Sequence, residues 1–327
     1  MRNKFGEPKA GCSMLIGCGS LVIIILVIYM IISMAALSGY MSEIYARSQG
    51  DQEQYLAYLQ GLVDNVANEM SALNLDYLQI LMNAAQIVTL FLIFKLIYKR
   101  PLSQMGLSAQ HWFKRLNAGC LTGIIGISLY ALIASVSGLA VFTGFDLQNL
   151  LSVDMLTSLI FFISIGFYEE ILNRGFFMTI LKTTRRKIMI IALPAVIFGC
   201  MHILNPNITL LGLINIILIG LAFAFMFIKT GSLWMPIGFH ITWNFFQGNI
   251  FGIQVSGLEQ ASVMAYSAIG PDILTGGDFG AEGGLICTVI TLGLLAYLYF
   301  GFNVDEPPVW TLDSDLPFNN PPASVGN

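Results

Sequence analysis

Long apolar stretches alternate with short charged segments along this chain. Seven stretches contain no Asp, Glu, Lys or Arg: residues 10–42, 77–94, 116–145, 155–168, 188–228, 230–258 and 283–304. They are continuously apolar instead of alternating between apolar and polar residues, which favours helices over the strands of a membrane barrel. A helix needs about 20 mainly apolar residues to cross a bilayer. The pattern therefore predicts an all-α polytopic membrane protein.

Eight helices account for these stretches. The stretch 188–228 is too long for one span, and Asn205-Pro206-Asn207 near its middle predicts a turn. The stretch 155–168 is too short alone, so its helix must continue through the charged residues that follow. The predicted helices are 14–38, 77–98, 117–143, 152–178, 188–204, 209–228, 233–250 and 284–302.

Composition agrees with this class of protein. Of the 327 residues, 56% are hydrophobic and only 10% are charged, whereas soluble domains carry about 25% charged residues. The formal net charge of −4 provides no basic field for binding phosphates. An ordinary soluble enzyme and a nucleic-acid binder are therefore excluded.

The basic residues predict the orientation, because cytoplasmic loops carry an excess of Lys and Arg. With the N-terminus in the cytoplasm, 13 of the 15 basic residues lie inside. They are Arg2, Lys4, Lys9, Lys95, Lys99, Arg100, Lys114, Arg115, Lys182, Arg185, Arg186, Lys187 and Lys229. We therefore expect both termini to be cytoplasmic.

Three charged residues lie inside the fourth predicted helix: Glu169, Glu170 and Arg174. Each would cost about 2.5–3.5 kcal/mol at the centre of a bilayer. Glu170 and Arg174 are four residues apart, so they share a helix face and can pair. Glu169 is turned about 100° from Glu170, so it should point elsewhere and be left for chemistry.

Other polar residues reach a similar depth. From the rise of about 1.5 Å per residue, Glu169 lies about 20 Å from the basic boundary at 182, and His202 about 22 Å from the boundary at 187. His240 and Asn244 lie about 16 and 22 Å from Lys229 and share one face of the seventh helix. The sequence therefore predicts that these four residues meet in one layer. Phe198, four residues before His202, would wall the pocket.

Such a group of residues suits hydrolysis of a peptide bond. Glu169, His202 and His240 could bind a catalytic zinc that keeps a position for water. Without a metal, a carboxylate and a histidine can take the proton from water, and a second histidine with an amide can donate to the oxyanion. The sequence leaves both schemes open. It contains no His-Glu-x-x-His motif, no Gly-x-Ser-Gly motif and no paired intramembrane aspartates.

The motifs Glu169-Glu170-x-x-x-Arg174, Phe198-x-x-x-His202 and His240-x-x-x-Asn244 resemble, in order and spacing, those of the CPBP intramembrane proteases. That family groups CAAX prenyl endopeptidases with bacterial proteins of bacteriocin processing and self-immunity. The resemblance covers about residues 117–250.

The resemblance implies a role for each residue. Glu169 and His202 would activate water, and His240 with Asn244 would form the oxyanion hole. Glu170, Arg174 and Phe198 would support the site. Family members are often called metalloproteases, although some are argued to depend on glutamate, so zinc is one option and a metal-free mechanism the other.

The resemblance also divides the chain. We expect a two-helix region with an extracytoplasmic segment over 1–116, the catalytic core over 117–250, an extracytoplasmic loop and last helix over 251–302, and a disordered cytoplasmic tail over 303–327. The expected location is a bacterial plasma membrane.

The expected activity is an intramembrane endopeptidase acting on a membrane-embedded or membrane-adjacent peptide or protein, with a prenylated CAAX-like tail as one option. The alternative is a scaffold or bacteriocin self-immunity protein that uses the same cavity for binding only. Beyond the lipid bilayer and this substrate, the sequence predicts no nucleic-acid partner, and it does not set an oligomeric state.

Overall fold

The computed structural model describes residues 75–304 and, before them, only residues 19, 42, 45, 46, 48 and 51–56. The predicted first helix 14–38 lies outside the described residues, as do positions 305–327 of the predicted tail.

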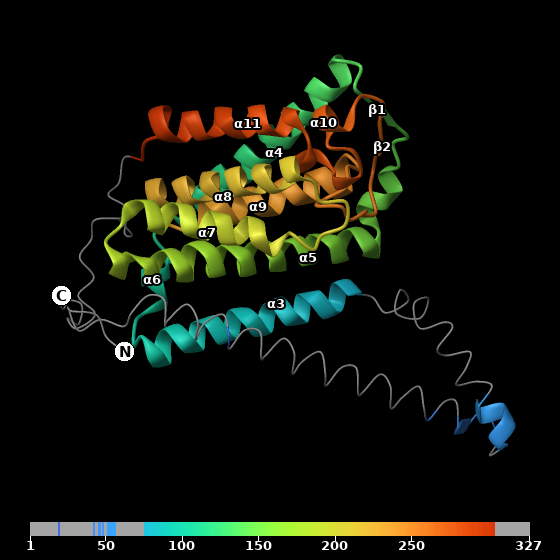
Figure 1. Ribbon diagram of the computed structural model, residues 1–327, viewed down its shortest axis with the longest axis horizontal. Coiled ribbons are helices and arrows are strands. Elements are labelled where there is room, and N and C mark those ends of the chain that lie inside the picture. The colour runs from blue at the N-terminus through green and yellow to red at the C-terminus, as the bar shows by residue number, and fades with distance from the viewer. Residues whose placement is uncertain are drawn as a thin grey trace.

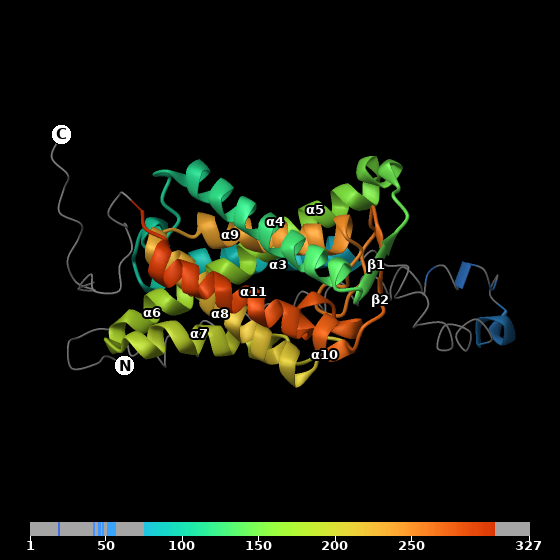
Figure 2. The same cartoon turned by 90° about the horizontal axis from the view of Figure 1, so that it is seen from above.

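The described chain is a bundle of helices (Figures 1 and 2). The helices are α3 (Leu75–Leu92), α4 (Trp112–Val136), α5 (Val153–Glu170), α6 (Thr179–Leu181), α7 (Lys187–Met201), α8 (Leu210–Thr230), α9 (Trp234–Phe245), α10 (Asp272–Thr275) and α11 (Leu285–Ala296). Wider π-helical turns extend four of them, over Ile93–Ile97, Ile171–Met178, Phe246–Ile250 and Tyr297–Gly301. Single 3₁₀ turns cover Leu102–Met105, Leu147–Leu151, Lys182–Thr184, Gly277–Phe279 and Ala281–Gly283.

Each predicted helix from 77–98 onward coincides with a helix of the structure. Within the described part, four helical stretches are long and apolar enough to cross a membrane: Tyr77–Ile97, Trp112–Val136, Val153–Thr184 and Leu210–Thr230. Two apolar helices are shorter, Lys187–Met201 and Leu285–Gly301. The count of eight spans and the orientation remain predictions.

One predicted boundary is wrong, and with it the expectation of a purely helical fold. The helix predicted over 117–143 ends at Val136, and Gly138 follows with a φ of 67°. Strand β1 (Ala140–Thr143) then pairs antiparallel with β2 (Ala265–Ala268), with Ala140 opposite Ala268. The turn breaks the helix, and the β-branched residues after it suit a strand. Because both segments are apolar, the sequence gives no break in hydropathy at this point.

The surface of the bundle is apolar where a membrane would contact it. Along α4, the exposed large side chains are Leu121, Ile125, Leu129, Leu132 and Val136, at spacings of three and four residues. They form one face of the helix. The side chain of Val136 is 79% exposed. Apolar side chains outside and charged ones within are the arrangement of a membrane protein.

Helices α4 and α9 pack at close range because glycines face the partner backbone. A Cβ on Gly119 would collide with the carbonyl of Met235, and one on Gly238 would lie 2.9 Å from the amide nitrogen of Cys120. Small residues let membrane helices approach in this way. This contact sets the position of α9, which carries two of the predicted site residues.

The segment between α9 and α11 is tied to the bundle by a buried carboxyl group. Glu282 is 4% exposed. It accepts hydrogen bonds from Trp243 Nε1 at 3.2 Å and Gln247 Nε2 at 2.7 Å. Its backbone carbonyl accepts from Asn215 of α8 at 2.7 Å. The sequence analysis did not single out Glu282, because nothing in its glycine-rich context signals burial.

This burial predicts a pH dependence of stability. Burial raises the pKa of Glu282, and the hydrogen bonds from Gln247 and Trp243 offset only part of the rise. The folded protein therefore holds a proton that the unfolded chain releases above an ordinary pKa of about 4.3. Stability should fall as pH rises from that value through the folded pKa, and should be constant below it. Thermal unfolding in detergent should show a smaller pH dependence for Glu282→Gln than for wild type, whereas Glu259→Gln, at an exposed carboxylate, should leave it unchanged.

Candidate active site

The first site element is the C-terminal half of the α5 stretch. Ser152 caps α5 by accepting from the amide of Met155 at 3.1 Å, as Ser at an N-cap commonly does. The α-helix ends at Glu170, and an eight-residue π-helical stretch, Ile171–Met178, follows with every residue buried. Such wide turns are rare and occur often at functional sites. The apolar pattern predicted a helix here but carried no signal for the wider turn.

The predicted ion pair is present and fully buried. Arg174 Nη1 donates to Glu170 Oε1 at 2.8 Å, and neither side chain is exposed. Arg174 Nη2 donates to the carbonyl of Gly220 in α8 at 2.9 Å. The guanidinium also lies over the rings of Phe198 and Phe223, at 4.7 and 4.9 Å from their centroids. These contacts offset the cost of burying the charge and join α5, α7 and α8.

His240 lies between the two glutamates. Its Nδ1 is 3.2 Å from Glu170 Oε1, and its Nε2 is 3.8 Å from Glu169 Oε2. The expectation that Glu169 points away from Glu170's contacts is therefore wrong. The two carboxylates leave the helix in different directions, but the two ring nitrogens of one imidazole reach both. Phe223 stacks on the ring, with centroids 5.1 Å apart and planes 21° apart.

Glu170 fixes which nitrogen of His240 carries a proton. Its Oε1 already accepts from Arg174, and a carboxylate can only accept. His240 Nδ1 must therefore donate to it, which orients the ring. The other nitrogen then faces Glu169. At 3.8 Å the gap to Glu169 Oε2 is too long for a direct hydrogen bond, and a single water can bridge groups at such a separation.

His202 lies directly after α7, at its C-terminal end. Its Nδ1 is 2.8 Å from the carbonyl oxygen of Phe198. Because that oxygen can only accept, Nδ1 donates, and in the neutral ring Nε2 is left as a proton acceptor. The ring of Phe198 contacts both imidazoles, with its centroid 4.9 Å from that of His202 and 6.1 Å from that of His240. Phe198 thus connects the two histidines, in line with its predicted place in the wall.

Asn244 lies four residues after His240 in α9 and is partly buried. Its side chain makes no hydrogen bond to any residue that the structure describes, so its amide is available to a ligand. The structure thus brings Glu169, Glu170, Arg174 and His240 into direct contact. His202 joins them through Phe198, and Asn244 extends the same helix.

The comparisons with known proteins agree with this site. Residues 151–246 match the family model described as type II CAAX prenyl endopeptidase Rce1-like. The chain carries an Rce1-like protease domain. The matched range runs from just before α5 to the end of α9 and includes the three motifs. Neither the comparison with curated proteins nor that with solved structures gave a match.

The match supports a CPBP-family intramembrane protease of the CAAX type. The helices within the matched range, α5 to α9, supply every side chain that forms the site. The rest of the described bundle supports this Rce1-like domain from outside, α4 against α9 and α11 against α8. The substrate and the roles of individual residues go beyond what the match shows.

Some contacts in the Rce1-like domain had no signal in the sequence. Phe223 and Gly220 lie in a uniformly apolar helix, where nothing distinguishes a ring that stacks on His240 from one that faces lipid. Asn173 could have been found, because an amide inside an apolar helix is costly to bury unpaired. Its Nδ2 donates to the carbonyl of Glu169 at 2.9 Å and steadies the backbone there.

The residues present do not form a metal centre. Among the described residues, no three His, Cys, Asp or Glu side chains are grouped so that they could hold a metal ion. Glu169, His202 and His240 therefore do not meet as a ligand set in this arrangement. Zinc stays a prediction that metal analysis of the purified protein would decide, and the reaction steps below use only side chains.

Proposed function

We propose that this chain is an intramembrane endopeptidase that hydrolyses a peptide bond in a membrane-embedded or membrane-adjacent substrate. The observation that supports this most directly is the carboxylate of Glu169. Its Oε2 is buried without a hydrogen-bond partner among the described residues, 3.8 Å from an imidazole nitrogen. A buried acceptor that the fold leaves unsatisfied is costly, so it is best explained by a group that binds there during function.

In the proposed reaction, Glu169 and His202 take the proton from the attacking water. Glu169 offers its unpartnered oxygen, and His202 offers Nε2, which the bond from Nδ1 to Phe198 keeps as an acceptor. The water adds to the carbonyl carbon of the scissile bond. The proton then passes to the leaving amine as the carbon–nitrogen bond breaks.

His240 and Asn244 would stabilise the oxyanion of the tetrahedral intermediate. When His240 is protonated at Nε2, it donates to that oxygen while Nδ1 keeps its bond to Glu170, which stabilises the charged ring. The amide of Asn244 supplies a second donor. Arg174 acts indirectly as a positioning residue, because it holds Glu170 and so fixes the ring.

The substrate enters at the level of the membrane, because the site lies among apolar helices. A prenylated CAAX-like tail is one candidate, since residues 151–246 match a CAAX endopeptidase model. The test is to reconstitute the purified protein and supply a quenched prenyl-peptide alongside unprenylated membrane-adjacent peptides. Cleavage of one of them supports the proposal. If none is cleaved and a Glu169→Gln variant still complements the cellular phenotype, the chain instead works as a binding scaffold or immunity protein.

Asn244 provides a prediction on the oxyanion role. Asn244→Ala should lower kcat about 10²–10³-fold, as loss of one oxyanion donor does elsewhere, with little change in KM. Asn244→Asp keeps the shape but loses the donor, so it should be equally impaired. Steady-state kinetics on the cleaved peptide measures both. A rise in KM at unchanged kcat would show that Asn244 binds substrate instead.

A further inference from the structure

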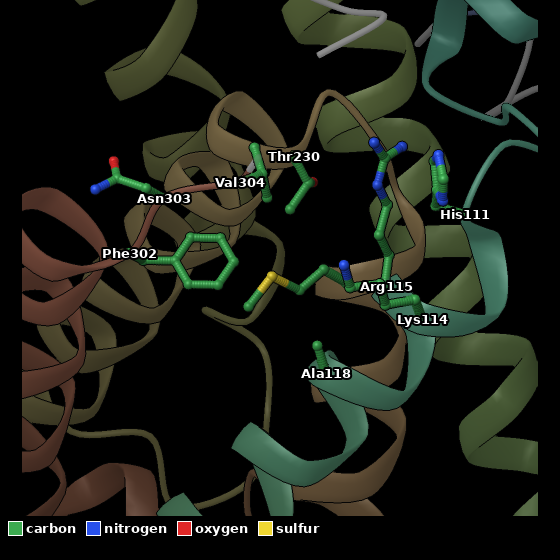
Figure 3. Close-up of a pocket in the computed structure, with 9 residues that line it drawn as sticks. His111, Lys114, Arg115, Ala118, Thr230, Phe302, Asn303 and Val304 are labelled. Atoms are coloured by element: carbon green, nitrogen blue, oxygen red, sulfur yellow. The ribbon is translucent and has the colours of Figure 1, made fainter. Parts of the chain in front are cut away.

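A second cavity lies away from the active site, where α4 begins and α8 and α11 end. It has a volume of about 230 Å³ and is lined by His111, Lys114, Arg115, Ala118, Thr230, Met235, Phe302, Asn303 and Val304 (Figure 3). None of the active-site residues is among them. Sites for drug-sized ligands span about 300–1,000 Å³, so this cavity suits a smaller group.

The cavity is positively charged. Two of the nine lining residues are Lys114 and Arg115, and none of the nine is acidic. Arg115 is 5% exposed, and its one described hydrogen bond runs from Nη1 to the carbonyl of Gln110 at 3.4 Å. No described carboxylate pairs with it. A buried guanidinium with five N–H donors and no counter-charge is costly, which indicates that an anion completes it.

The start of α4 adds to this field. The helix begins after His111 with no side chain capping its first turn, so its free N–H groups carry partial positive charge. Lys114 and Arg115 in that same turn oppose the helix dipole, an unfavourable placement unless an anion is bound. The preference for basic residues on one membrane side explains their presence. It does not explain the burial of Arg115, because exposed lysines satisfy that preference equally well.

The surroundings indicate where the anion comes from. Trp112 and Phe113 are exposed beside the cavity, and the Trp112 ring lies 5.7 Å from that of Trp234. Exposed aromatic residues at helix ends mark the interface between membrane and water. Met235 and Phe302 give the cavity an apolar wall opposite its charges. A charged head beside an apolar wall at this level matches a membrane lipid.

We propose that this cavity binds the phosphate of an anionic phospholipid headgroup. Arg115 holds the phosphate oxygens through its planar fork, and Lys114 adds a second charge. The glycerol and upper acyl carbons lie against Met235 and Phe302. The bound lipid then joins the start of α4 to the ends of α8 and α11.

The test measures lipid binding to the full chain by native mass spectrometry, with phosphatidylglycerol or phosphatidylcholine added to the micelles. One phosphatidylglycerol should bind at least about tenfold more tightly than phosphatidylcholine, the difference expected from about one charge-assisted contact. Arg115→Gln should remove this preference. Lys95→Gln removes an exposed charge outside the cavity and should change the affinity by less than about twofold, as isolated surface charges do.

Other arms separate the alternatives. Ala118→Leu fills the cavity while keeping both charges and should also weaken phosphatidylglycerol binding, which keeps the test decisive if Arg115→Gln does not fold. Equal losses for Arg115→Gln and Lys95→Gln, or none for Ala118→Leu, would overturn the site. Displacement of the lipid by inorganic phosphate alone at equal concentration would show a free-phosphate site and overturn the assignment to lipid.

Discussion

Replacing Glu169 by Gln should lower the single-turnover rate of peptide cleavage by about 10²–10⁴-fold, the contribution typical of a positioned general base. Glutamine has nearly the same shape but cannot take a proton from water. The protein should fold normally, because Glu169 Oε2 makes no hydrogen bond that the fold depends on. Substrate affinity should change little, because the carboxylate acts on the water and not on the peptide. Cleavage of a quenched peptide at saturating enzyme measures the effect.

The control for this prediction is Glu259→Gln, the same chemical change at an exposed carboxylate outside the site. It should cleave at the wild-type rate. If Glu169→Gln also cleaves at that rate, Glu169 is not the base, and His202 alone or another group activates the water.

Replacing Glu170 by Gln should destabilise the fold by about 3–5 kcal/mol, the cost of leaving one member of a buried ion pair unpaired. Arg174 would remain fully buried, with only the carbonyl of Gly220 and two aromatic rings as partners. His240 would also lose the acceptor for its Nδ1 proton. Denaturant titration in detergent, followed by circular dichroism, measures the loss of stability.

Two comparisons make this prediction specific. Glu53→Gln, at an exposed carboxylate, should change the free energy of unfolding by no more than about 0.5 kcal/mol. The double variant Glu170→Leu/Arg174→Met should recover much of the stability lost in Glu170→Gln, because removing both charges leaves neither one unpaired. Equal losses for Glu170→Gln and Glu53→Gln would show that the pair contributes nothing.

The helices of the core could be predicted from sequence because the bilayer imposes a simple rule on length and apolarity. The rule fails where a segment is apolar but not helical. Residues 140–143 look like the continuation of α4 but form β1, because the pairing with β2 depends on a strand more than 100 residues away. The π-helical stretch after Glu170 is hidden for a similar reason, since it changes the hydrogen bonding and not the hydropathy.

The active site could be predicted because charges inside apolar helices are rare and costly. Their depth, taken from helix rise, brought Glu169 and His240 together, and i,i+4 spacing gave the pair of Glu170 with Arg174. The position of His240 between both carboxylates could not be derived, because it depends on how α9 packs against α5. Phe223 and Glu282 were missed because contacts between helices leave no trace in a single apolar segment.

The central claim is that Glu169 and His202 act on the same water, and a double-mutant cycle tests it most directly. Single-turnover cleavage would be measured for wild type, Glu169→Gln, His202→Gln and the double variant in the same reconstituted membranes. Residues that act as a unit are not additive, so the double variant should be no slower than the slower single variant. If the two rate losses multiply, Glu169 and His202 act independently, and the proposed mechanism is wrong.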